Sequence, residues 1–202
     1  MKFSFVNPAP SADTPSMVTS AWPPLGMLYI AGMLINEGIE VSILDQAIRN
    51  ATIEQTINWV KKQNPDIVGF SVCGSSAREA FKVVEAVKQA NPDTLTVLGN
   101  YHATFNAERI LRKYQGVDLI VRGEGEYTSV DLVKALQEKR SLKKVDGITF
   151  RNNGKIVSTP DRPLIKNIDE LPFPDRSLMN AEYTSLIHGI RAATKPFTTV
   201  VS

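Results

Sequence analysis

Short apolar runs alternate with longer segments of mixed polarity along the first 140 residues of the chain. The run IVGFSV, within residues 66–72, is apolar at nearly every position, which is typical of a parallel strand covered on both faces. We predict five strands, each followed by a helix, at residues 2–6, 39–44, 66–72, 96–98 and 118–122. This repeat favours a doubly wound parallel α/β sheet, and right-handed crossovers favour the flavodoxin-like (Rossmann-like) strand order 2-1-3-4-5.

Start and stop signals position the helices between these strands. We predict a helix at Leu25–Asn36, because Pro24 suits a first turn and Gly38 suits a helix end. Two pairs have the spacing of a capping box and predict helices that run to Lys62 and Ala90: Thr52 with Gln55, and Ser76 with Glu79. We expect further helices at about residues 105–114 and 127–139, and polar corners at residues 45–50 and 100–102.

The pattern changes after residue 140. The runs 147–150 and 155–159 flank Asn153-Gly154, and Asn-Gly between alternating runs predicts a β-hairpin. Residues 160–175 contain several prolines and are predicted to be a linker that hugs a surface or spans a gap. The strand-like run at residues 197–202 leads us to expect that the chain stops short of a second domain. We therefore divide the chain into an α/β domain (1–140), a hairpin and linker (141–180) and the start of a further domain (181–202).

Composition narrows the class of protein. The 202 residues are 43% hydrophobic and 22% charged, as in an ordinary soluble globular protein. The net charge of +2 gives no case for binding nucleic acid or a membrane surface, and no apolar run is long enough to span a bilayer. Cys73 is the only cysteine, which excludes an internal disulfide and a multi-thiolate metal site. We expect a cytoplasmic protein.

Five corners that follow the predicted strands should meet at the carboxyl edge of the sheet, where open α/β sheets bind ligands. They are residues 7–24, 45–50, 71–76, 99–102 and 123–126. Small residues dominate this edge, among them Gly69, Ser71, Gly74, Ser75, Gly99, Gly123 and Gly125. Such an edge lets a large, neutral, flat ligand lie against the backbone, and glycine lets a part of it enter between strands and helices.

Three familiar sites fit the corners poorly. A phospho-receiver needs acidic residues after the first strand and an aspartate after the third, where this chain has Asn7 and Ser71. A dinucleotide site needs G-x-G-x-x-G after the first strand, which is absent there. A flavodoxin-like phosphate loop could use the serines and threonines of residues 7–24, but this loop is too long and rich in proline for a tight phosphate cradle. No spacing suggests a Ser-His-Asp site, and we predict no catalytic residue.

The order of several short motifs resembles the cobalamin-binding domain at the amino end of cobalamin-dependent radical SAM enzymes. The motifs are Pro23-Pro24-Leu25-Gly26, Asp66-Ile67-Val68-Gly69-Phe70-Ser71, Leu98-Gly99-Asn100-Tyr101-His102-Ala103-Thr104, Val121-Arg122-Gly123-Glu124-Gly125-Glu126 and Leu171-Pro172-Phe173-Pro174-Asp175. The resemblance implies that cobalamin lies across the sheet edge with its nucleotide tail inserted into the domain. The cofactor-binding candidates that it implies are Pro24, Leu25, Gly26, Asp45, Ser71, Val72, Gly74, Gly99, Asn100, Tyr101, His102, Gly123, Glu124 and Gly125.

The resemblance also implies a partner outside this chain. In such enzymes a radical SAM barrel follows, and it carries the iron–sulfur cluster and binds S-adenosylmethionine. Residues 181–202 would be the truncated start of that barrel. The parent would be a methyltransferase or a ring-forming enzyme similar to the anaerobic magnesium-protoporphyrin ester cyclase.

Two positions depart from the family pattern. After the second strand, cobalamin domains often carry D-x-H-x-x-G, whose histidine replaces the cofactor's own base on cobalt; here Asp45 is followed by Ala47 at the histidine position. Asn100 replaces the second glycine of a Gly-Gly pair after the fourth strand. His102 could be a helix-start residue, a cofactor-edge contact or a cobalt ligand, and we expect no histidine of this domain beneath cobalt. Two alternatives stay open: a cofactor-free docking domain of the same fold, and a flavin-binding domain.

Overall fold

A computed structural model describes residues 1–10, 23–179, 183, 186–187 and 190–191. Its main sheet contains β1 (Lys2–Asn7), β2 (Glu40–Asp45), β3 (Ile67–Ser71), β4 (Leu95–Gly99), β5 (Leu119–Val121), β6 (Ile148–Asn152) and β7 (Lys155–Ser158). The helices are α1 (Leu25–Asn36), α2 (Gln46–Arg49), α3 (Ile53–Gln63), α4 (Ala77–Ala90), α5 (Tyr101–Phe105), α6 (Ala107–Lys113) and α7 (Glu126–Gln137). Three short 3-10 helices follow, η2 (Leu142–Lys144), η3 (Ile168–Glu170) and η4 (Arg176–Leu178), and then a strand pair, β8 (Leu186–Ile187) and β9 (Ile190–Arg191). Residues 11–22 of the first loop and the terminal run 197–202 lie outside the described residues.

The main sheet has the strand order β2-β1-β3-β4-β5-β6-β7. Its first five strands are parallel and have the predicted order, so the predicted fold class is confirmed. The predicted hairpin also forms, with positive φ angles at Asn153 and Gly154, but it pairs antiparallel with β5 and extends the sheet to seven strands instead of five. The hairpin covers an edge of β5 that would otherwise expose a row of unpaired backbone groups.

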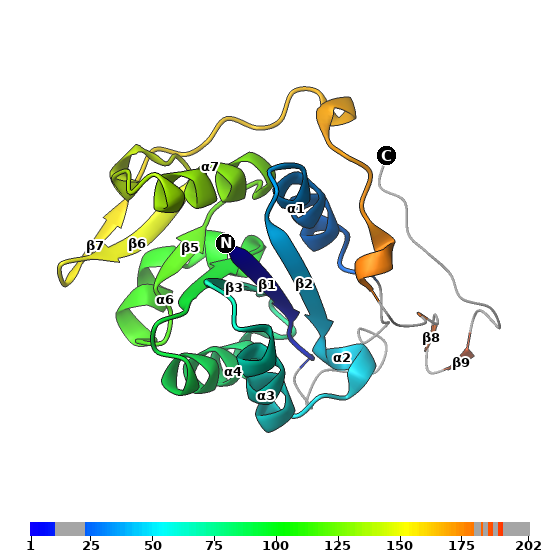
Figure 1. The fold of residues 1–202 in the computed structure, drawn as a ribbon. Coiled ribbons are helices and arrows are strands. Elements are labelled where there is room, and N and C mark those ends of the chain that lie inside the picture. The colour runs from blue at the N-terminus through cyan, green and yellow to red at the C-terminus, as the bar shows by residue number, and fades with distance from the viewer. Residues whose placement is uncertain (11–22, 180–182, 184–185, 188–189, 192–202) are drawn as a thin grey trace.

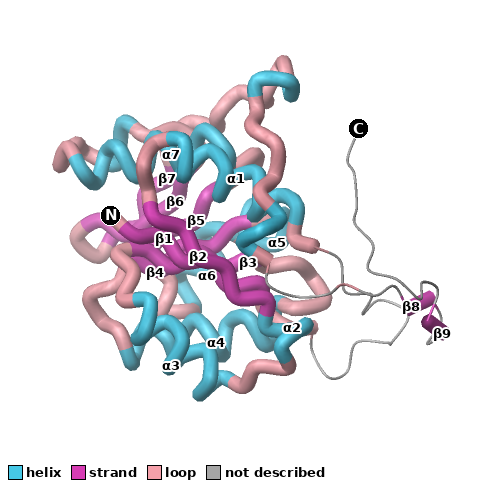
Figure 2. Tube along the Cα trace, turned by 45° about the vertical axis from the view of Figure 1, so that its right-hand side comes forward, coloured by secondary structure: helices cyan, strands magenta, loops and turns pink. Residues whose placement is uncertain are grey.

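Helices cover both faces of the sheet. Helices α1 and α7 lie together on one face, and α3 and α4 lie on the other (Figure 1). The tube view shows the same layers from a second direction (Figure 2). The face under α1 and α7 carries one apolar cluster, which includes Phe3, Phe5 and Leu28, while the other face carries a second cluster that includes Phe70 and Val84. The carboxyl ends of the parallel strands therefore emerge between two separately packed layers.

One of the two predicted capping boxes forms in the structure, and the other does not. Thr52 and Gln55 form the predicted reciprocal capping box at the start of α3. The predicted box of Ser76 and Glu79 is wrong, because the Ser76 hydroxyl turns back to accept from the backbone N–H of Cys73 at 3.3 Å and makes no cap bond to α4. This serine stabilises the 73–76 turn instead.

Two predicted corners are helical in the structure. Residues 46–49 form α2, and Tyr101 and His102 already belong to α5, so the polar corners at residues 45–50 and 100–102 are shorter than expected. The helix expected at about residues 105–114 forms as α6, and the chain breaks at Asn106 between it and the short helix α5, which was not expected. The Asn106 side chain donates to the carbonyl of His102 at 2.9 Å and so occupies a helix acceptor.

The described part of the linker returns over the outer side of α7 and α1 (Figure 1). The Arg162 guanidinium donates to Thr128 Oγ1 and Asp131 Oδ2, both at 2.9 Å. Further along, Pro172 lies against Gly32 of α1, where an added Cβ would lie 3.0 Å from its ring. The linker thus follows the surface of the two helices that cover one face of the sheet.

Arg122 joins the end of β5 to the hairpin. Its guanidinium donates to the carbonyls of Ile148 and Thr159, to the hydroxyl of Thr149 and to the carboxylate of Asp161. The Arg122 side chain is 13% exposed, so its planar fork satisfies the two carbonyls and the Thr149 hydroxyl largely away from water, while Asp161 lies at the surface. This side chain reinforces the backbone pairing of β5 with β6, which joins the parallel part of the sheet to its antiparallel extension.

Replacing Arg122 by lysine should destabilise the domain, because an ammonium group cannot reach all of these acceptors in one plane. We expect Arg122→Lys to lower the free energy of unfolding by about 1–3 kcal/mol in urea denaturation. Arg112→Lys is the matched control, since Arg112 pairs with Glu108 on the exposed side of α6, and its effect should stay within about 0.5 kcal/mol. Equal effects of the two substitutions would contradict this role.

Candidate functional site

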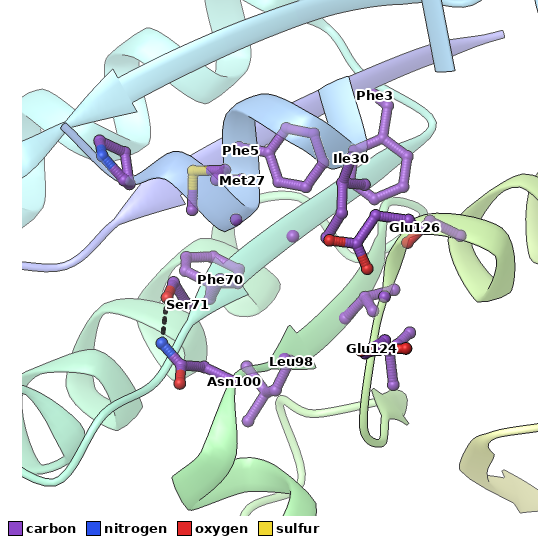
Figure 3. Close-up of a pocket in the computed structure, with 18 of the residues that line it drawn as sticks. Phe3, Phe5, Met27, Ile30, Phe70, Ser71, Leu98, Asn100, Glu124 and Glu126 are labelled. Atoms are coloured by element: carbon purple, nitrogen blue, oxygen red, sulfur yellow. Dashed lines mark hydrogen bonds between the residues drawn. The ribbon is translucent and has the colours of Figure 1, made fainter. Parts of the chain in front are cut away.

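A cavity of about 390 Å³ lies between the sheet and the starts of α1 and α7, at the carboxyl edge (Figure 3). Strands β1, β3, β4 and β5 supply its floor, and the segment from Gly123 to Glu126 closes one side. It is lined by Phe3, Phe5, Pro24, Leu25, Gly26, Met27, Ile30, Gly69, Phe70, Ser71, Val97, Leu98, Gly99, Asn100, Val121, Gly123, Glu124, Gly125, Glu126 and Ser129. Most of these side chains are apolar, and the polar groups gather at two places, near Asn100 and near Glu124 and Glu126.

The alternation of side chains along the strands explains why a cavity forms here. On the face under α1 and α7, β3 presents Ile67 and then Gly69, and β4 presents Val97 and then Gly99. Successive side chains of a strand point to opposite faces, so Phe70 packs in the opposite core. On the face under α1 and α7, side chains therefore cover the sheet near its amino edge, while near its carboxyl edge the glycines leave space above the strands.

Two glycines of the floor have opposite surroundings. A Cβ added to Gly69 would lie 2.8 Å from the Phe3 ring and 3.0 Å from the Phe5 ring, so the missing side chain makes room for these rings. The two rings stack on each other with centroids 4.4 Å apart. A Cβ added to Gly99 or Gly26 would meet no atom of the described chain within 4 Å, so at both positions the backbone borders open space.

The two floor glycines should therefore respond differently to alanine. Gly69→Ala should lower the free energy of unfolding by about 1–3 kcal/mol, because the buried rings of Phe3 and Phe5 must shift. Gly99→Ala, a matched substitution on the next strand, should change it by less than about 0.5 kcal/mol. Urea denaturation of both variants provides the measurement, and a large loss in Gly99→Ala would show that this position is packed.

Asn100 and Ser71 form the rim of the cavity at the ends of β4 and β3. The Asn100 amide donates to Ser71 Oγ at 2.9 Å (Figure 3), and its carbonyl oxygen accepts from the backbone N–H of Tyr101 at 2.6 Å. Asn100 has φ 78° and ψ 169°, a backbone conformation that glycine adopts readily and other residues rarely. The hydrogen bonds of the side chain offset this strain and cap α5.

The two glutamates of the 123–126 segment have different surroundings. Glu124 is exposed at the rim, and its Oε2 accepts a 2.5 Å hydrogen bond from the backbone N–H of Ile165 in the linker. Glu126 is turned into the cavity toward Ile30 and Phe3 (Figure 3), and its Oε2 is buried without a hydrogen-bond partner among the described residues. Burial raises the pKa of the Glu126 carboxyl above its ordinary value, although its own backbone N–H opposes this, and the nearby Glu124 carboxylate raises the pKa further.

This shift makes the stability of the domain depend on pH. Because the folded state holds the Glu126 proton more tightly than the unfolded chain, this contribution to the free energy of unfolding is complete below the ordinary carboxyl pKa. It is lost as the pH rises from that value through the raised pKa.

Glu126→Gln cannot titrate, so its free energy of unfolding should gain on that of the wild type across this pH window and then run parallel above it. Urea denaturation at a series of pH values from about 4 to 8 would measure the difference. Glu54→Gln changes an exposed glutamate in the first turn of α3 and is the matched control for helix position. A constant difference between wild type and Glu126→Gln at all pH values would contradict the assignment.

The structure brings together nine of the fourteen predicted cofactor-binding residues at the cavity: Pro24, Leu25, Gly26, Ser71, Gly99, Asn100, Gly123, Glu124 and Gly125. They come from corners that are far apart in sequence, as the parallel topology requires. Their role in binding a cofactor remains a prediction.

The other five predicted residues do not line the cavity. Asp45 is buried at the end of β2, where its Oδ2 accepts from the hydroxyl of Tyr183 at 2.8 Å. Val72 packs in the core under α3 and α4, and His102 lies in α5 on the side of Phe81, with ring centroids 6.1 Å apart. The remaining two contact each other at the same sheet edge: the Tyr101 hydroxyl accepts from the backbone N–H of Gly74 at 3.0 Å.

Sequence reasoning missed the inner part of the cavity. Its inner wall includes Phe3, Phe5, Ile30 and Glu126. None of these four residues is among the predicted cofactor-binding residues. Gly69 was the available signal, because a glycine inside an apolar strand often marks a close approach of other groups.

The residues that the structure describes contain no group of three or more histidine, cysteine, aspartate or glutamate side chains placed to hold a metal ion. In the same part of the chain, no helix is both long and apolar enough to cross a membrane.

A mainly parallel α/β sheet with an apolar, glycine-bordered cavity at its carboxyl edge defines a small-ligand-binding domain. Residues 16–133 match the family described as the B12 binding domain. The chain belongs to this B12-binding domain family, which confirms the resemblance drawn from the sequence motifs.

The relatives include enzymes of two kinds. The chain is 37% identical over 179 residues to the uncharacterized methyltransferase PH0819 of Pyrococcus horikoshii, across 89% of this chain and 39% of that protein. It is 32% identical over 170 residues to the anaerobic magnesium-protoporphyrin IX monomethyl ester cyclase of Rubrivivax gelatinosus, across 82% of this chain and 30% of that protein. The chain therefore spans less than half the length of both relatives.

Solved structures share the fold. The cobalamin-dependent S-adenosylmethionine radical enzyme OxsB, with aqua-cobalamin and S-adenosylmethionine bound, matches with a TM-score of 0.67 and 25% identity, over 81% of this chain and 22% of that one. The radical S-adenosylmethionine methyltransferase TsrM from Kitasatospora setae, with cobalamin and a 4Fe–4S cluster bound, matches with a TM-score of 0.67 and 19% identity, over 85% and 30%. At 19% identity, the similarity to TsrM shows a shared fold alone.

Proposed function

We propose that this chain binds cobalamin with the corrin across the carboxyl edge of the sheet and the nucleotide tail in the cavity beneath α1. The observation that carries the proposal is the open space at Gly26 and Gly99, where an added Cβ would meet no atom of the described chain within 4 Å. Glycines without packing neighbours are explained if a ligand, rather than the protein, fills the space beside them.

The size of the cavity supports a position with the nucleotide tail inside and the corrin ring outside. Its volume of about 390 Å³ lies at the lower end of the range for small-molecule sites. A cavity of this volume can hold a nucleotide tail but is too small for a whole corrinoid. The corrin ring would therefore remain outside, at the edge of the sheet. The apolar lining from α1 and β1 suits the flat, neutral base at the end of the tail.

The rim would meet the corrin. Ser71 and Asn100 offer hydroxyl and amide groups there, and amides around a corrin ring are suitable hydrogen-bond partners for both. Ala47 occupies the position where related domains carry a histidine, and His102 lies outside the cavity lining. We therefore propose that no histidine of this domain lies beneath cobalt. The bound cofactor would supply methyl transfer or tune a radical step.

The remainder of the enzyme would complete the reaction. The names of the relatives point to a methyltransferase or a cyclase, and the iron–sulfur cluster and S-adenosylmethionine would belong to a radical SAM barrel outside this chain. The described linker runs past the cavity rim, where Ile165 donates to Glu124. It would therefore connect the corrin side of this domain with that barrel.

The proposal predicts that filling the space at Gly99 blocks cobalamin without unfolding the domain. The wild-type chain, mixed with hydroxocobalamin and passed through gel filtration, should retain a corrin absorption spectrum. Gly99→Val should bind about 10- to 100-fold more weakly, because the added side chain enters space that the tail needs. Valine suits a strand, so the thermal unfolding midpoint should change little.

Lys155→Val provides the control, since it places the same side chain on an exposed position of β7. It should bind cobalamin like the wild type. Absence of corrin absorption from the wild-type protein would refute the proposal and would favour a cofactor-free docking domain. Wild-type affinity in Gly99→Val would place the tail elsewhere.

A further inference from the structure

Glu126 places a carboxyl group in the apolar part of the cavity. Its Oε2 is buried and has no hydrogen-bond partner among the described residues. Nearby lie the apolar side chains of Phe3 and Ile30 (Figure 3). A buried polar oxygen without a partner is unfavourable, so such a group calls for an explanation in a folded protein.

The neighbouring glutamate does not share this situation. Glu124 lies at the rim, is exposed, and accepts a hydrogen bond from the backbone of Ile165. Glu126 begins α7, where a carboxylate is favourable, yet it is turned inward rather than toward water. The orientation of Glu126 therefore places its carboxyl group in the cavity, which the start of a helix does not require.

The shape of the cavity near Glu126 suits a flat aromatic ring. Phe3 and Phe5 stack over Gly69 with an interplanar angle of 26°. Ile30 approaches Gly125 from α1, so that an added Cβ there would lie 2.7 Å from its Cδ1, and this contact brings the two helix starts together. A planar heterocycle that enters along the aromatic floor would bring its edge to the Glu126 carboxyl.

The base at the end of the cobalamin tail has the matching chemistry. A benzimidazole attached to its sugar through one ring nitrogen has a second ring nitrogen that accepts one hydrogen bond when it does not bind cobalt. A protonated carboxyl group has one O–H to donate. We propose that Glu126 is a positioning residue for the tail: its protonated carboxyl donates a hydrogen bond to the free ring nitrogen of the benzimidazole. This inference rests on the proposed binding of cobalamin in this cavity.

The state of the carboxyl group agrees with this geometry. Burial among apolar side chains disfavours the charged form, and the Glu124 carboxylate at the rim disfavours it further, so the pKa of Glu126 is raised. Among the residues that line the cavity, Glu124 and Glu126 are the ones with acidic side chains, and none carries a basic group. Both effects shift the balance toward the neutral carboxyl group, which can donate a hydrogen bond, while the backbone N–H groups of Glu126 and Gly125 oppose them.

The test compares three corrinoids: cobalamin, cobinamide, which lacks the nucleotide tail, and a cobamide whose lower base is a phenol without a ring nitrogen. Dissociation constants come from absorption titration of the whole chain. Glu126→Met should weaken cobalamin binding about 10-fold, the effect of losing one buried hydrogen bond, and leave cobinamide binding within about 2-fold. It should also remove the preference for cobalamin over the phenol-based cobamide.

Two further variants make the result specific. Glu126→Gln keeps an N–H donor of similar shape and should bind cobalamin within about 3-fold of the wild type. Glu54→Met, at an exposed first-turn position of α3, should bind all three corrinoids like the wild type. Thermal unfolding checks that each variant is folded. If Glu126→Met does not fold, Glu126→Gln still tests the hydrogen-bond donor at this position.

The outcomes separate this inference from the proposed function. Binding of cobalamin and cobinamide by the wild type, with equal losses for both in Glu126→Met, would overturn the positioning role and leave cobalamin binding intact. Unchanged cobalamin affinity in Glu126→Met would overturn it in the same way. Failure of the wild type to bind either corrinoid would refute the proposed function and with it this inference.

Discussion

The alternation of side chains along the parallel strands is the constraint on which the rest of the structure depends. The same strands must fill a core under α3 and α4 and leave space under α1 near the carboxyl edge. They achieve both because large residues such as Phe70 and Leu98 point one way, while Gly69 and Gly99 occupy positions that face the other. A shift of one residue in register would reverse this arrangement and fill the cavity while emptying the core.

The packing of the two helices over the cavity also depends on a missing side chain. Gly125, at the start of α7, lies so close to Ile30 of α1 that an added Cβ would be 2.7 Å from its Cδ1. This close approach sets the roof of the cavity and directs Glu126 inward beneath it. The segment that begins α7 therefore does more than start a helix, because its backbone geometry decides which carboxyl group enters the apolar space and which stays at the rim.

The sequence predicted the strand order and most of the rim because both follow from local signals. Short apolar runs identify the strands, and a parallel topology brings their carboxyl ends to one edge. The inner wall could not be predicted, because Phe3, Phe5 and Ile30 have the pattern of any core residue, and only the positions of neighbouring glycines make them cavity walls. The seven-stranded sheet was also missed, since an Asn-Gly hairpin specifies its own turn but not the strand with which it pairs.

The segment after β5 links the cavity to the rest of the chain. Within five residues, Arg122 holds the hairpin and the linker start, Glu124 accepts from the linker at Ile165, and Glu126 enters the cavity. These contacts run through one short, glycine-containing turn, in which Gly123 has φ +68°. The same turn therefore supplies contacts to the hairpin, to the linker and to the cavity. Because the side chains at 122, 124 and 126 leave it toward three different neighbours, one short segment determines the surroundings of both carboxyl groups.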